Sequence, residues 1–277
     1  MVNMNISRMK RNGLILVLIS LVIIIVMIDI LDYQFSDDIV LSNMINNTTA
    51  RILGGTVFSI IIISIGHKVF NAKRNTTVKS IIIMSPALLI SIYNFPFIAH
   101  FSGNAMISKP IYYLYYFIIE CISVGFFEEV VFRGFLLVLL IQLFPKNKVG
   151  LLKSIIISAA IFGLIHMVNL FAGANLANTF LQIGYSFLVG LLWAVVFVKT
   201  KSIWFGVVLH AIYNFAGLVF FQFGEITNNA DVITIITTTI LAIGVAIYMA
   251  YIFNGIKQTE IDDLHKSIYL NVSLKKT

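Results

Sequence analysis

The sequence has few charged residues and a single cysteine. Lys, Arg, Asp and Glu make up 11% of the 277 residues, whereas a typical soluble domain contains about 25%. Apolar residues make up 59%, and the mean hydropathy is +0.97. Because so few charges could not cover the surface of a water-soluble domain, a soluble enzyme, a disordered chain and a secreted disulfide scaffold are excluded. Cys121 has no second cysteine to pair with, so no internal disulfide can form.

Long apolar runs fill most of the chain instead. A helix needs about 20 mainly apolar residues to cross a bilayer, and eight such runs rich in Ile, Leu, Val and Phe are present. They are residues 14–31, 52–70, 80–98, 111–144, 151–171, 179–198, 203–223 and 232–253. The fourth run would be about 50 Å long as a straight helix, so it must tilt, kink or project from the membrane. We predict an all-α fold, a polytopic membrane helix bundle of about eight spans that forms a single integral membrane domain over residues 1–277.

The distribution of Lys and Arg predicts the orientation of these spans. Of the 19 basic residues, 16 lie in the two terminal segments and in every second connection, whereas the other connections hold only Arg51 and Lys109. Cytoplasmic connections are the ones enriched in Lys and Arg, so both termini are predicted to be cytoplasmic. The net charge of +7 then reflects membrane orientation, and we expect membrane lipids rather than nucleic acid as partners.

The first run follows a basic segment, as a signal peptide would. It lacks a cleavage site of small residues before Asp32, so we interpret it as a retained helix. Residues 46–49 contain glycosylation sequons, which have no meaning in a bacterium. The heavy use of Ile, Asn and Lys suggests an AT-rich bacterial genome, and a bacterial cell membrane is the expected location.

A small set of polar residues falls inside the apolar runs. Ionisable groups at membrane depth are costly and usually functional. They are Glu120, Glu128, Glu129, Arg133, His166 and His210, with Asn214 as a neutral companion. We interpret Asp29, at the outer end of its run, as interfacial, and we expect Glu120 near the outer interface or a pore.

Two adjacent acids precede an arginine in the fourth run. Glu129 and Arg133 are four residues apart, so they share one helix face and can form an ion pair. Glu128 lies about 100° further round the helix, which leaves its carboxylate unmatched by that arginine. The alternative interpretation is that the three residues form a purely structural ion cluster. Two acids with one arginine leave one negative charge unbalanced, however, and helix packing does not require that charge.

Three further polar residues lie on two later runs. His166 ends the sequence Phe-Gly-Leu-Ile-His, and His210 and Asn214 are four apart on one helix face. A carboxylate in an apolar pocket can take a proton from water near neutral pH. A histidine can orient that water, and a second histidine with an asparagine can donate to the oxyanion that forms on a peptide carbonyl. Neither Cys121 nor Ser123 has an assigned base.

Two aromatic residues and several glycines have structural interpretations. Trp193 and Trp204 fit the aromatic belt near the cytoplasmic interface. Six glycines are expected to permit close helix contact. They are Gly54, Gly55, Gly163, Gly184, Gly190 and Gly206.

The three motifs together resemble the CAAX protease and bacteriocin-processing (Abi) family of intramembrane endopeptidases, which includes the type II CAAX prenyl endopeptidases. The motifs are Glu128-Glu129-x-x-x-Arg133, Phe162-x-x-x-His166 and His210-x-x-x-Asn214. The resemblance covers residues 112–221, the expected catalytic core. It implies that Glu128 is the general base, that His166 helps to hold the water, and that His210 and Asn214 form the oxyanion site.

The resemblance leaves the metal and the biological role open. The family was first described as metalloproteases, and Glu128, His166 and His210 could ligate zinc. The sequence has no His-Glu-x-x-His signature, so we favour a mechanism without a metal or other cofactor and keep zinc as the alternative. The substrate would be a membrane-associated peptide or protein, and the role could be peptide maturation or bacteriocin self-immunity. A rival class is a proton-coupled transporter that uses the same polar residues as a relay, although no internal repeat is evident.

Overall fold

A computed structural model describes residues 33–70, 78–171, 173–227 and 232–268. The predicted run 14–31 and Asp29 lie outside the described residues. The elements are α2 (Ile39–Ser64), α3 (Val78–Tyr93), α4 (Phe97–Phe101), β1 (Ala105–Ile107), α5 (Tyr112–Glu129), η1 (Val130–Leu137), α6 (Val138–Leu143), α7 (Lys148–Leu164), η2 (Ile165–Leu170), α8 (Leu176–Thr200), α9 (Ile203–Phe223), β2 (Gly224–Ile226), α10 (Val232–Asn254) and α11 (Gln258–Ile268). Apart from two short strands the described fold is helical, so the all-α class is confirmed.

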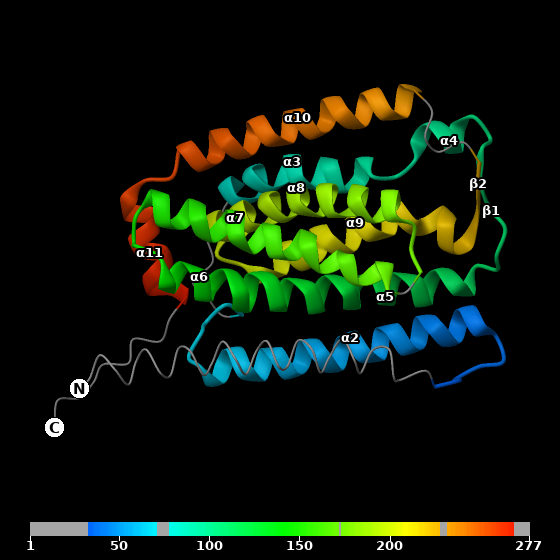
Figure 1. Cartoon of the computed structure of the whole chain (residues 1–277), viewed down its shortest axis with the longest axis horizontal. Coiled ribbons are helices and arrows are strands. Elements are labelled where there is room, and N and C mark those ends of the chain that lie inside the picture. The colour runs from blue at the N-terminus through cyan, green and yellow to red at the C-terminus, as the bar shows by residue number, and fades with distance from the viewer. Residues whose placement is uncertain (1–32, 71–77, 172, 228–231, 269–277) are drawn as a thin grey trace.

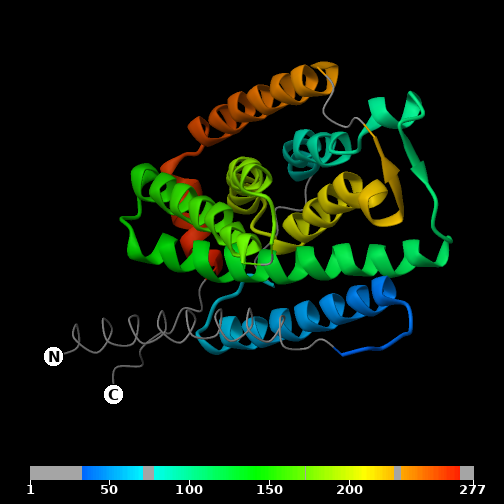
Figure 2. The same cartoon turned by 45° about the vertical axis from the view of Figure 1, so that its right-hand side comes forward.

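The helices form three layers, which Figures 1 and 2 show from two directions. Helix α2 lies on one side and α10 on the opposite side, with α3, α5, α7, α8 and α9 between them. The most extensive helix contacts join α5 to α9, α7 to α8, and α2 to α5. The middle layer therefore holds the three helices that carry the predicted site motifs.

Several helices have the length and composition of membrane spans. Among the described residues these are Ile39–Ser64, Lys148–Leu170, Leu176–Thr200 and Ile203–Phe223. The segments Thr239–Asn254 and Gln258–Ile268, bent by 91° at their junction, give a fifth candidate. Helix α5 is not among them, since its 18 residues include Glu120, Glu128 and Glu129. The chain is thus an integral membrane protein, whereas the count of eight spans and the orientation of the termini stay predictions.

Two of the predicted runs have different boundaries in the structure. The predicted helix bounds 52–70 were wrong, because α2 begins at Ile39 and ends at Ser64. The Asp38 carboxylate accepts from the backbone N–H groups of Val40 and Leu41 and caps the helix start. The run 80–98 is broken because α3 ends at Tyr93; Pro96 disfavours helical geometry at the residue before it.

The earlier start of α2 moves Arg51 into the helix, facing α5. Arg51 was predicted in a connection, but its Nη1 lies 3.7 Å from Glu120 Oε1. Asn47 Nδ2 donates to the same carboxylate oxygen at 3.1 Å. Glu120 is only 7% exposed. The acid that we expected at an interface or a pore therefore joins α5 to α2.

The run 111–144 is a continuous helical stretch made of α5, η1 and α6, and its central part, η1, is a π-helix. Ser158 Oγ on α7 donates to the carbonyl of Phe132 within the π-helical segment at 3.2 Å. Such segments are rare and are often found at functional sites. This one begins directly after Glu129. The sequence did not predict it, since a run that is apolar all round shows no change of period.

The connections gather at two opposite ends of the bundle (Figure 2). At one end β1 pairs with β2 in an antiparallel ribbon, with Met106 opposite Glu225. At the other end α11, bent by 91° from α10, runs across the end of the bundle (Figure 1). Lys199 Nζ contacts Glu260 at 2.8 Å, and Lys201 pairs with Asp263. The segment after α10 is thus folded as far as Ile268.

Candidate active site

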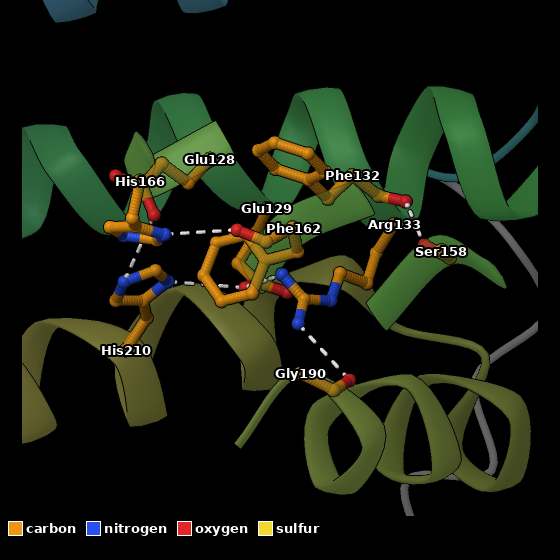
Figure 3. Close-up of polar contacts among 9 residues, drawn as sticks. All are labelled: Glu128, Glu129, Phe132, Arg133, Ser158, Phe162, His166, Gly190 and His210. Carbon is orange, nitrogen blue, oxygen red and sulfur yellow. Dashed lines mark hydrogen bonds and ion pairs between the residues drawn. The ribbon is translucent and has the colours of Figure 1, made fainter. Parts of the chain in front are cut away.

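Glu129 and Arg133 form a buried ion pair in the middle layer, as their spacing predicts. Arg133 Nη1 donates to Glu129 Oε1 at 2.7 Å, and each side chain is 1% exposed. Arg133 Nη2 donates to the carbonyl of Gly190 on α8 at 3.2 Å (Figure 3). The arginine therefore neutralises Glu129 and ties the start of the π-helical segment to α8.

His210 on α9 lies between the two adjacent glutamates. Its Nδ1 is 3.2 Å from Glu129 Oε1, and its Nε2 is 3.4 Å from Glu128 Oε2 (Figure 3). Carboxylate oxygens accept hydrogen bonds, so an imidazole protonated on both nitrogens can donate to both acids. The i,i+4 spacing predicted the pairing of Glu129 with Arg133 but not this second contact, which joins α9 to α5.

The two glutamates differ in exposure as well as in partners. The Glu128 side chain is 21% exposed and that of Glu129 is 1% exposed. Glu128 contacts His210 but not Arg133 among the contacts of the described residues. Glu128 is therefore the carboxylate of the pair that can reach a bound molecule.

His166 lies at the end of α7, where the chain passes into the 3₁₀ segment η2. Its Nδ1 is 2.9 Å from the carbonyl of Phe162. A helix end leaves carbonyls without intrahelical partners, and a carbonyl can only accept. The proton must therefore be on Nδ1, which leaves Nε2 of the neutral ring with a lone pair that can accept a hydrogen bond from water.

Asn214 lies one turn beyond His210 on α9 and is half-buried. Within the described part of the chain its side chain makes no hydrogen bond, so its amide donors are not engaged by the protein there. It shares the helix that carries His210, as the spacing predicts.

Trp193 is buried inside the bundle and not on its outer surface, so its assignment to the aromatic belt was wrong. Its side chain is 1% exposed, and its ring is stacked on His210 with the centroids 4.4 Å apart and the planes at 27°. The apolar sequence around Trp193 could not distinguish a belt residue from a buried one. Trp204, by contrast, is 41% exposed.

Phe162 lies at the centre of the cluster. Its ring is perpendicular to both imidazoles, with centroids 5.4 Å from His166 and 6.0 Å from His210. The Arg133 guanidinium carbon lies 4.6 Å from the Phe162 centroid, which is a cation–π geometry. Phe162, the first residue of the Phe162-x-x-x-His166 motif, thus contacts both histidines and the arginine.

Gly206 on α9 provides the space that Glu129 occupies. A Cβ at this position would lie 2.5 Å from Glu129 Oε2. At Gly163 and Gly190 an added Cβ would meet the neighbouring helix at 2.9 Å and 3.1 Å, so these contacts agree with the prediction. Gly184 was predicted as a contact glycine, but an added Cβ would meet none of the described residues within 4 Å, so that prediction was wrong.

A mainly apolar cavity of about 280 Å³ lies near the cluster, between α3, α8, α9 and α10. Tyr185 and Tyr213 line it, with ring centroids 6.4 Å apart. Tyr213 also lies 5.7 Å from Trp193, the ring that covers His210. The cavity wall and the polar cluster therefore share a continuous set of aromatic side chains.

The possible zinc ligands are not arranged as a metal site. Among the described residues no group of three or more His, Cys, Asp and Glu side chains is arranged to hold a metal ion. Glu128, His166 and His210, the set considered for zinc, are not brought together as such a group. Of the two His166 ring nitrogens only Nδ1 is engaged by the described residues, at the Phe162 carbonyl, whereas both nitrogens of His210 face carboxylates.

The fold and the cluster define an all-helical membrane protein with a polar site enclosed by its middle layer. Residues 110–216 match the family described as type II CAAX prenyl endopeptidase Rce1-like. This segment contains the two glutamates, Arg133 and both histidines, and it relates the chain to the CAAX proteases, which are peptide hydrolases. No curated protein and no solved structure matches the chain.

Proposed function

We propose that this protein is an intramembrane endopeptidase in which Glu128 activates water to hydrolyse a peptide bond. One observation carries the proposal. Of two adjacent carboxylates, Glu129 is buried and paired with Arg133, whereas Glu128 is partly exposed and faces His210 at 3.4 Å. A general base needs a free, accessible carboxylate near the groups that bind the reacting carbonyl.

The reaction begins with a water molecule held near Glu128 and His166. Glu128 takes a proton from this water as its oxygen attacks the peptide carbonyl carbon. The His166 Nε2 lone pair accepts the hydrogen bond that orients the water, because Nδ1 is committed to the Phe162 carbonyl. The proton on Glu128 then passes to the leaving amine as the carbon–nitrogen bond breaks.

The developing oxyanion needs donors on the opposite side of the carbonyl. His210 supplies the N–H group at Nε2, the nitrogen that faces the partly exposed Glu128, while its Nδ1 faces the buried Glu129. The Asn214 amide supplies a second donor on the same helix. Removal of one such donor typically costs about 100- to 1,000-fold in kcat. We therefore expect loss of either donor to lower kcat and to change KM little.

The mechanism uses no metal, and zinc remains the alternative. The purified enzyme is expected to keep its activity after chelation and dialysis. One equivalent of tightly bound zinc that is needed for activity would favour the zinc-dependent form of the same protease.

The substrate is proposed to be a membrane-associated peptide or protein in a bacterial cell membrane. Peptide maturation and bacteriocin self-immunity are the two roles considered. The experiment compares the membrane and secreted peptides of cells that express the wild type or Glu128→Ala at equal levels. Peptides that accumulate uncut only in the Glu128→Ala cells would support the proposal. Identical peptide profiles, with the wild type also inactive on a fluorogenic peptide library, would contradict it.

A further inference from the structure

Helix α8 contributes no acid, base or metal ligand to the site, yet two of its residues hold site residues. The carbonyl of Gly190 accepts from Arg133, and three residues later the Trp193 indole covers His210. The stack, at 4.4 Å between centroids, is the shortest ring contact of either histidine in the cluster.

The orientation of the indole is fixed from several sides. The rings of Phe162 and Tyr213 approach it edge-on, at 6.4 Å and 5.7 Å between centroids, and the Arg133 guanidinium lies 5.5 Å from its centroid. The Trp193 Nε1 atom is buried and has no hydrogen-bond partner among the described residues. A buried indole N–H usually finds a partner, so the ring position is determined by the stack rather than by a hydrogen bond.

His210 needs such a restraint because its two nitrogens have different partners. Nδ1 faces Glu129 and Nε2 faces Glu128, both along the edge of the ring. Contacts at the edge do not stop the ring from tilting out of plane, whereas a parallel ring against its face does.

We infer that Trp193 is a positioning residue, whose stacked indole holds the His210 ring in the plane that directs its nitrogens at Glu128 and Glu129. The inference rests on the proposed function, in which His210 donates to the oxyanion. Trp193 itself touches no reacting atom.

Kinetics of two substitutions test this role. Trp193→Leu removes the ring face and Trp193→Phe keeps one. Because a displacement of about 1 Å can cost about 100-fold in rate, Trp193→Leu is expected to lower kcat about 100-fold with little change in KM. Trp193→Phe should recover most of that loss. Trp204→Leu, at the other tryptophan of the chain, is the matched control and should leave kcat unchanged.

Fluorescence supplies a readout that does not depend on hydrolysis. In a Trp204→Phe chain, Trp193 is the one remaining tryptophan. A stacked imidazole quenches indole emission, so adding His210→Ala should increase the emission. Adding His166→Ala, whose ring contacts Phe162 and not Trp193, should leave it nearly unchanged.

The outcomes separate this inference from the proposed function. The positioning role would be overturned if Trp193→Leu and Trp193→Phe lowered kcat equally, or if the loss of activity appeared as a higher KM. Either outcome would leave the proposed protease function in place. Unchanged emission in the His210→Ala chain would overturn the stack itself, even if Trp193→Leu failed to fold. Increased emission with no hydrolysis by the wild type would instead reject the proposed function and retain the stack.

Discussion

At the scale of single residues, neighbouring glutamates have different surroundings because helix geometry turns them apart. Glu129 points to Arg133 and to Nδ1 of His210, inside a layer where each ion-pair partner is 1% exposed. Glu128 meets only the other nitrogen of the same imidazole within the described contacts. His210 therefore connects a structural ion pair to the proposed base.

The Glu129–Arg133 pair predicts a specific pattern of stability. Breaking a buried pair by removing one partner costs about 3–5 kcal/mol, because the other charge stays buried. Glu129→Gln and Arg133→Ala should each lower the melting temperature in detergent. The double variant should be less harmful than the sum of the two single variants. Strict additivity of the two effects would show that the charges are not coupled.

Gly206 predicts a steric effect at the same carboxylate. Gly206→Ala should displace Glu129, since the added Cβ would lie 2.5 Å from Oε2, and overpacking of this kind costs about 1–3 kcal/mol. Gly184→Ala is the control, because its Cβ would meet no atom of the described part of the chain within 4 Å. Melting temperatures of both variants test this, and an equal effect of the two substitutions would contradict it.

At the scale of elements, apolar length predicted the helices well where it was the main signal. Helix α9 has the predicted bounds 203–223, and α10 differs from its run by one residue. The start of α2 was missed because polar residues 46–49 suggested a connection. Their helical state depends on Asp38 as a cap and on the pairing of Asn47 and Arg51 with Glu120.

For the site, the sequence predicted contacts within one helix but not contacts between helices. The i,i+4 spacing was enough to pair Glu129 with Arg133, because both lie at one helix face. The stack of Trp193 on His210 joins α8 to α9, and the His210–Glu129 contact joins α9 to α5. Such contacts depend on how helices pack, which spacing within one run does not specify.

The α2–α5 contact predicts a coupled pair between two elements. Arg51→Leu should destabilise the protein because Glu120, 7% exposed, is then left without its cation. Adding Glu120→Leu should restore part of the stability, since replacing a buried pair by apolar residues is often neutral. A double variant that is less stable than Arg51→Leu alone would show that the pair does not hold α2 against α5.

At the scale of the whole molecule, connections from distant parts of the sequence meet at common ends. The segments that contain Lys146, Lys199 and Lys201 contact α11 and its flanking residues. The connections around β1 and β2 meet at the opposite end. The segments that meet at α11 belong to the set rich in Lys and Arg, and the two that carry β1 and β2 belong to the other set.

Topology is predicted from that count. Reporter fusions after Asp38 and after Lys73 should lie on opposite sides of the membrane, with the second one cytoplasmic. Both termini should also report the cytoplasmic side. A common location for the two internal fusions would contradict the orientation.

The most direct measurement is the turnover of purified Glu128→Gln on a fluorogenic peptide that the wild type cleaves, with its melting temperature recorded in the same detergent. Loss of a general base typically costs about 100- to 10,000-fold in rate. Because Glu128 is partly exposed and not paired with Arg133, the variant should keep its stability and lose almost all turnover. An active Glu128→Gln, beside a stable but inactive Glu129→Gln, would show that the roles of the two glutamates are reversed.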